Sequence, residues 1–210
     1  MSVGVAEGID RASAPDGIDG AGLRVGVVRA RWNPGVVERL AEGVERGLKA
    51  LGVVPDDIVE VSVPGSFEIP FGARALATSG RVDAVVCIGS VIRGETTHYD
   101  IVAGECARGV QQVQLTTGVP VAFGVLTTED ERQALARSEG PGGHNVGEEA
   151  ALVAVEMARI AQHLGHVPPQ LVRFPIDPEL VGCLEAVRIP VGLPVEDLQL
   201  AALGNVLAAQ

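Results

Sequence analysis

A loop that leads into His98 is the segment of the chain best suited to chemistry. The loop runs from Gly89 to Thr96 as GSVIRGET and continues through Thr97 into an expected helix. Its glycines are spaced as in an ATPase phosphate loop, but Glu95 stands where such a loop carries lysine, which excludes an ATPase. Backbone N–H groups at the start of a helix still favour an anion. A tight turn capped by Thr96 or Thr97 is the alternative.

His98 is the candidate proton carrier, because histidine exchanges a proton near neutral pH. An exposed or packed histidine is the alternative. No metal-ligand spacing joins it to the other histidines, which are His144, His163 and His166, and no metal is expected. Arg93 and Arg137 are the candidate anion ligands, although a lone arginine at a helix end more often only interacts with the helix dipole.

Aromatic residues cluster at one predicted edge of the molecule. The chain has only six of them, and three lie at or just past the carboxyl ends of expected strands: Trp32, Phe67 and Phe123. Core packing explains any one of them, but together they favour a planar ligand. Glu68 is suited to accepting hydrogen bonds from sugar hydroxyls, with an exposed loop acid as the alternative.

Two other kinds of chemistry are disfavoured. Lys49 is the single lysine, which leaves almost no source for an enzyme Schiff base. Cys87 lies inside a buried strand and is expected to act as a small hydrophobe. With Cys106 and Cys183 it forms neither a disulfide framework nor a zinc knuckle.

Strands and helices alternate along the chain. Continuous apolar runs predict buried strands at 23–30, 57–63, 82–89 and 119–126. Helical spacing predicts helices at 34–51, through Ala77, from about 102 to 118, at 130–137 and up to Leu164. This alternation predicts an α/β fold whose parallel sheet is covered on both faces and binds ligands beyond the carboxyl ends of its strands.

Composition excludes several classes of protein. A net charge of −11 argues against a dedicated nucleic-acid binder, and no apolar run is long enough to span a membrane. The first residues lack the pattern of a signal peptide, so a cytoplasmic location is expected. Residues 1–22 are predicted to be a flexible arm. Residues 166–210 hold six of the thirteen prolines and are predicted to form an extension, with short helices at 178–187 and 195–209.

Five segments of the chain together resemble one family, lumazine synthase. They are RWN (31–33), VPGSFEIP (63–70), GSVIRGETTHYDIV (89–102), PVAFGVLTTEDERQALAR (120–137) and NVGEEAA (145–151). They follow the family's order and spacing over about residues 22–165. The resemblance implies a flavodoxin-like three-layer sandwich with a central four-stranded parallel sheet, formed by residues 23–165.

The resemblance also implies a reaction in riboflavin biosynthesis. The family condenses 5-amino-6-(D-ribitylamino)uracil with 3,4-dihydroxy-2-butanone 4-phosphate, and releases 6,7-dimethyl-8-ribityllumazine, phosphate and water, with no cofactor or metal. Matching positions give His98 as proton carrier. They give a substrate-binding set of Trp32, Asn33, Ser66, Phe67, Glu68, Ser90, Val91, Ile92 and Phe123, and a phosphate-binding set of Glu95, Thr96 and Arg137.

Assembly and partners are implied by the same resemblance. Phe123 and Arg137 would come from a neighbouring subunit of a pentamer, which in some members builds an icosahedral shell of sixty subunits. Riboflavin synthase is a further implied partner. Val146 stands where many members carry a lysine near the phosphate, and the extension has no counterpart in typical members. A catalytically weakened shell or scaffold protein, with a tail that docks a partner, is the alternative reading.

Overall fold

The structure, a computed structural model, describes residues 17–165. Most of the predicted arm and the whole predicted extension, including its two expected helices, lie outside the described residues.

Four parallel strands form a single sheet in the order β2-β1-β3-β4. The strands are β1 (Val25–Ala30), β2 (Ile58–Val63), β3 (Ala84–Ile92) and β4 (Val121–Thr128). All four predicted strands are therefore confirmed, and so is their parallel arrangement.

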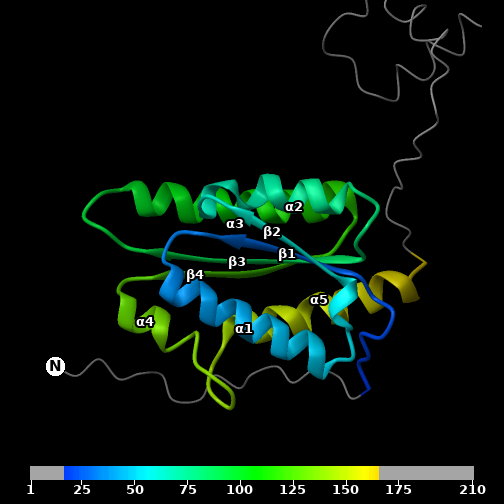
Figure 1. The fold of residues 1–210 in the computed structure, drawn as a ribbon. Coiled ribbons are helices and arrows are strands. Elements are labelled where there is room, and N and C mark those ends of the chain that lie inside the picture. Colours follow the sequence, from blue (N-terminus) through cyan, green and yellow to red (C-terminus); the bar gives the residue numbers. More distant parts are fainter. Residues whose placement is uncertain (1–16, 166–210) are drawn as a thin grey trace, which may run out of the picture. The chain divides into compact units, whose positions relative to one another are not determined.

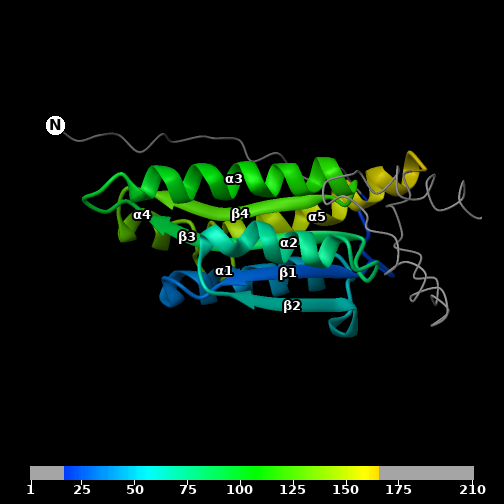
Figure 2. The ribbon, with the colours of Figure 1, turned by 90° about the horizontal axis from the view of Figure 1, so that it is seen from above.

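Helices cover both faces of this sheet (Figure 1). One face carries α1 (Pro34–Ala50), α4 (Glu131–Leu135) and α5 (Val146–His163). The other carries α2 (Ile69–Ala77) and α3 (His98–Thr117), which lie above the strands in Figure 1 and in front of them in Figure 2. Two short 3-10 turns, Pro55–Asp57 and Ser66–Glu68, precede β2 and α2. The expected flavodoxin-like three-layer sandwich is confirmed.

The two central strands contribute side chains to the hydrophobic cores on both faces of the sheet. Along β1 and β3 successive side chains point to opposite faces, so Val27 and Val86 pack toward α1 and α5 while Val28 and Val85 pack toward α2 and α3. Polar side chains would be costly at these positions. This is why both strands are continuous apolar runs.

Two strands end later than predicted. The third strand continues to Ile92 instead of ending at residue 89, because Gly89–Ile92 pair with Val125–Thr128 of β4 after the pairing with β1 stops at Ile88. The fourth strand is shifted two residues later than predicted. Ser90, Val91 and Ile92 therefore lie in a strand and not in a loop.

The packed chain begins before the predicted boundary at residue 22. Arg159 of α5 donates hydrogen bonds to the carbonyl oxygens of Asp19 and Ala21, at 2.6 and 2.8 Å. Gly20 N–H donates to the Leu51 carbonyl oxygen at 2.6 Å. Residues 19–21 are thus tied to both helices of the α1–α5 face.

Within residues 17–165, no helix is long and apolar enough to cross a membrane.

Helices α1 and α5 pack unusually closely, because small residues line their contact. A Cβ atom at Gly47 would lie 2.9 Å from the Ala151 Cβ atom and 3.0 Å from the Glu148 carbonyl oxygen. Neither of these atoms belongs to a flexible side chain that could move aside. The crossing therefore depends on glycine at this position.

We predict that Gly47→Ala lowers the free energy of unfolding by about 1–3 kcal/mol, because the added methyl group overpacks the α1–α5 contact. Gly35→Ala in the same helix is the matched control, since a Cβ atom there meets nothing within 4 Å. That variant should be unchanged or up to about 1 kcal/mol more stable, from helix propensity. Urea unfolding followed by circular dichroism compares them, and equal stability of the two variants would contradict the packing argument.

Candidate active site

A cleft of about 640 Å³ opens at the carboxyl edge of the sheet. It is bounded by the segments that follow β1 and β2, by the end of β3 and by the first turns of α3. Ten of the predicted site residues line it: Trp32, Asn33, Ser66, Phe67, Glu68, Ser90, Val91, Ile92, Thr96 and His98. The parallel topology brings these residues together from three segments that are spread over residues 32–98.

The β1–α1 turn is held in an unusual conformation. Asn33 has φ 57° and ψ 56°, the only positive φ of a non-glycine residue among those described. Its side-chain Nδ2 donates to the Ser90 carbonyl oxygen at 2.9 Å, which fixes this turn to the end of β3. Left-handed backbone at a non-glycine residue is strained, and such strain concentrates at functional sites. The turn presents Trp32 to the cleft with 72% of its side chain exposed.

The β2–α2 loop supplies a second aromatic side chain and a carboxylate. Phe67 lines the cleft and is 55% exposed. Glu68 Oε2 accepts a hydrogen bond from Gly65 N–H at 2.9 Å, so one carboxylate oxygen holds its own loop. A Cβ atom at Gly65 would lie 3.3 Å from the Trp32 ring, which shows how closely the two loops approach. Two exposed aromatic side chains beside polar groups suit a planar ligand that carries hydroxyl groups.

Arg93, in the loop between β3 and α3, makes several side-chain contacts. Its guanidinium group forms ion pairs with Glu129 at 2.8 Å and Asp100 at 3.2 Å, and lies 4.0 Å from the centre of the Tyr99 ring. The hydrogen bond to Glu129 raises the pKa of Arg93, and Asp100 adds to this effect. The arginine predicted as an anion ligand is thus engaged with two carboxylates. Its contacts connect the loop to Glu129, which follows β4, and to Asp100 in α3.

The first turn of α3 combines His98 with backbone donors. His98 is the first residue of the helix, its side chain is exposed, and its N–H group donates to Thr96 Oγ1 at 3.4 Å. The helix is 20 residues long, so its amino end carries a substantial positive dipole. The histidine predicted to carry protons and the amino end of this helix therefore lie at the same side of the cleft.

Three predicted residues do not line the cleft: Glu95, Phe123 and Arg137. Glu95 is exposed in the loop between two lining residues, Gly94 and Thr96. The prediction that Phe123 lies at a strand's carboxyl end is wrong. Phe123 is the third residue of β4 and pairs with Cys87, three positions before the pairing partner of Ser90, or about 10 Å back along the strand.

Arg137 lies beyond the end of α4 and is exposed. Its Nη1 donates to the Gln133 carbonyl oxygen at 3.0 Å. Val146, at the position of the family lysine, packs partly against the core of the α1–α5 face.

Other lining residues were missed by sequence reasoning. Tyr99, Ile101 and Val102 line the cleft from α3, together with Gly65 and Gly94. A helix start placed at His98 indicates Ile101 and Val102, because residues three and four positions after His98 share its helix face. Within residues 17–165, no group of three or more His, Cys, Asp or Glu side chains could hold a metal ion.

The two described cysteines belong to the core and not to the cleft. Cys87 and Cys106 are buried on the α2–α3 face. Burial raises the pKa of the Cys87 thiol far above its usual value and that of Cys106 to about 12. Both thiols therefore stay protonated at physiological pH, which confirms the prediction that Cys87 acts as a small hydrophobe.

A parallel α/β sandwich of the flavodoxin-like kind, with an aromatic cleft beyond its strand ends, defines a protein that binds small molecules at the sheet edge. Residues 22–162 match a family model described as 6,7-dimethyl-8-ribityllumazine synthase, so the chain belongs to that family. Membership places the chain in riboflavin biosynthesis, as a transferase that acts on small-molecule substrates and assembles as a homo-oligomer.

We predict that neither Cys87 nor Cys106 reacts with iodoacetamide in the folded protein at pH 8.5, because a raised pKa leaves almost no thiolate and burial blocks access. Both should react fully in urea. Mass spectrometry of the alkylated peptides reports each cysteine separately from Cys183. Labelling of either residue in the folded protein at the rate seen in urea would disprove the assignment.

Proposed function

We propose that this protein condenses 5-amino-6-(D-ribitylamino)uracil with 3,4-dihydroxy-2-butanone 4-phosphate to form 6,7-dimethyl-8-ribityllumazine, phosphate and water. The observation that carries the proposal is the cleft, where ten residues expected from the family resemblance converge. The family match over residues 22–162 supports the same reaction.

The cleft offers both apolar rings and polar groups to the pyrimidine substrate. Trp32 and Phe67 offer apolar ring surfaces to the uracil ring. Glu68, Asn33 and Ser66 offer polar groups to the ribityl hydroxyls and the ring. Backbone groups of Ser90, Val91 and Ile92 at the end of β3 are assigned to the pyrimidine edge.

The phosphate is assigned to the amino end of α3 and to Arg137. Glu95 and Thr96 contribute a backbone N–H group and a hydroxyl, and the helix dipole favours the dianion. Arg93 is paired with two carboxylates and Val146 is apolar, so Arg137 is the arginine that we assign to the phosphate. Because Arg137 and Phe123 lie outside the cleft of their own chain, we assign both to the site of a neighbouring subunit.

The chemistry needs orientation and proton transfer more than covalent catalysis. The imine forms between the amine of one substrate and the ketone of the other, so no enzyme lysine takes part. His98 would carry protons to and from the reacting groups as water and phosphate leave. Holding the two substrates together supplies much of the remaining acceleration.

The assembly proposed is a pentamer, with an icosahedral shell and a complex with riboflavin synthase as further proposals. A cytoplasmic location stays a prediction. The convergence of the lining residues favours an active enzyme over a scaffold protein. Formation of the lumazine from the two substrates, followed by absorbance, tests the proposal, and an assembled protein without turnover would support the scaffold.

We predict that His98→Ala lowers kcat about ten- to a thousandfold, because it removes the proton carrier. His163→Ala is the control, since His163 is exposed at the end of α5, away from the cleft residues, and should leave kcat unchanged. Steady-state kinetics compares the variants. A wild-type kcat in His98→Ala would remove this residue from the mechanism.

A further inference from the structure

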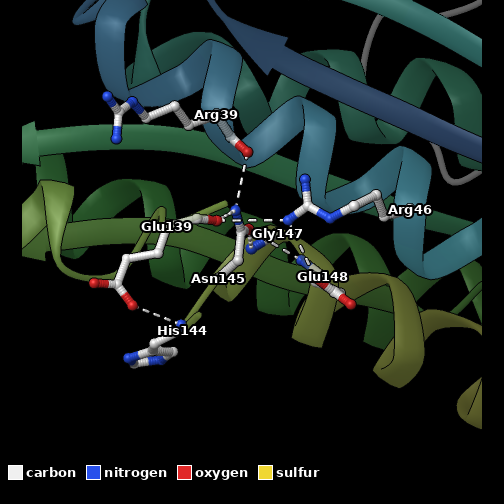
Figure 3. Close-up of polar contacts among 7 residues, drawn as sticks. All are labelled: Arg39, Arg46, Glu139, His144, Asn145, Gly147 and Glu148. Atoms are coloured by element: carbon white, nitrogen blue, oxygen red, sulfur yellow. Dashed lines mark hydrogen bonds and ion pairs between the residues drawn. The ribbon is translucent and has the colours of Figure 1, made fainter. Parts of the chain in front are cut away.

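Asn145 is a buried side chain with every hydrogen-bonding group used (Figure 3). Its Nδ2 donates to the carbonyl oxygens of Arg39 in α1, at 3.0 Å, and of Glu139, at 2.8 Å. Its Oδ1 accepts from the N–H groups of Gly147 and Glu148, at 2.9 and 3.3 Å. Only 2% of the residue is exposed. One amide thus joins α1, the loop before α5 and the first turn of α5.

Glycines in the surrounding backbone leave room for the Asn145 side chain and for the close approach of α1. A Cβ atom at Gly43 of α1 would collide with the Asn145 side chain, and a Cβ atom at Gly147 would collide with the Leu40 carbonyl oxygen. Both glycines therefore allow α1 to approach the start of α5 closely. A well-packed polar group with all partners in place has one low-energy position.

Backbone hydrogen bonds connect Arg137 to the segment that contains Asn145. Residues 138 and 145 form an antiparallel bridge, and Glu139 N–H donates to the His144 carbonyl oxygen at 2.9 Å. Val146 N–H donates to the carbonyl oxygen of Arg137 itself, also at 2.9 Å. Arg137 therefore lies at the open end of a small hairpin that turns at residues 140–143, and Asn145 ties the opposite arm of that hairpin to α1.

Only half of the hydrogen bonds of Asn145 serve as a helix cap. Capping α5 needs an oxygen that accepts from Gly147 and Glu148, and aspartate or serine supplies one equally well. The two donor bonds reach Arg39 and Glu139, which lie outside α5. These donor bonds fix the hairpin against α1, and a residue chosen only as a cap would not need them.

We propose that Asn145 is a positioning residue, which holds the Arg137 hairpin against α1 so that Arg137 meets the phosphate of the butanone substrate. This inference rests on the proposed function. It assigns to Asn145 an effect on one substrate only, since Asn145 does not line the cleft that is assigned to the pyrimidine.

The test uses Asn145→Asp and Asn145→Ser in the full chain. Both keep a capping oxygen and lose the amide NH2 group that bonds Arg39 and Glu139, and serine adds no charge, so agreement between them separates the loss of these donors from electrostatics. We expect KM for the butanone phosphate to rise about five- to fiftyfold in both, with KM for the pyrimidine unchanged. Thr117→Val is the control: it removes a buried hydroxyl that donates to the Val113 carbonyl oxygen at the far end of α3. It should lower the melting temperature without changing either KM.

Arg137→Ala allows a double-mutant cycle with Asn145→Ser. If Asn145 acts through Arg137, adding Asn145→Ser to Arg137→Ala raises KM for the butanone phosphate no further. A further rise by the same factor would overturn the proposal. So would a wild-type KM in both Asn145 variants, which would leave Asn145 as a helix cap only.

Binding of inorganic phosphate, measured by calorimetry, separates this inference from the proposed reaction. Failure of the wild type to form lumazine would contradict the proposed function alone. Weaker phosphate binding in Asn145→Ser and in Arg137→Ala, by similar factors, would support the positioning role even then. Equal phosphate affinity in the wild type and Asn145→Ser, or no phosphate binding by the wild type, would overturn it.

Discussion

The parallel pairing of four strands is the constraint on which the site depends. Parallel strands end at the same edge, so the segments that follow β1, β2 and β3 must meet there. The sheet also extends β3 along β4 beyond its pairing with β1, which carries Ser90, Val91 and Ile92 to the rim. A single hydrogen bond, from Asn33 to the Ser90 carbonyl oxygen, then locks the first loop against this extension. The cleft follows from sheet geometry, with few polar contacts needed to complete it.

The contact between α1 and α5 supports Arg137, which lies outside the cleft of its own chain. The close α1–α5 contact depends on glycine and alanine, and Asn145 is buried at its end. The Arg137 hairpin is attached to this contact and not to the cleft. In the proposed reaction, the sheet edge and the region at the start of α5 would supply two separate half-sites. A homo-oligomer is the natural way to bring them together.

Much of the fold and of the cleft can be predicted from the sequence, because apolar runs and the residues that follow them are local features of the chain. Continuous apolar runs identified all four strands, and the spacing of residues after them placed Trp32, Asn33 and Phe67 at one edge. What the sequence could not show depended on pairing across the sheet. The prediction ended β3 at the glycine, whereas β4 continues it to Ile92. The position predicted for Phe123 is wrong for a different reason, since the predicted strand at 119–126 itself contains Phe123 three residues before its end. The sequence gives no sign of the contacts of Asn145, because its bond to Arg39 joins positions 106 apart in the chain.

The emission of Trp32 tests the central claim most directly, since it is the chain's only tryptophan and lines the cleft. The measurement is a titration with 5-amino-6-(D-ribitylamino)uracil, corrected for absorption by the ligand. If the pyrimidine stacks in this cleft, Trp32 fluorescence is quenched and saturates at one ligand per chain, at concentrations close to the KM for that substrate. Lumazine formation with Trp32 emission unchanged at saturating pyrimidine would place the reaction elsewhere and contradict the account.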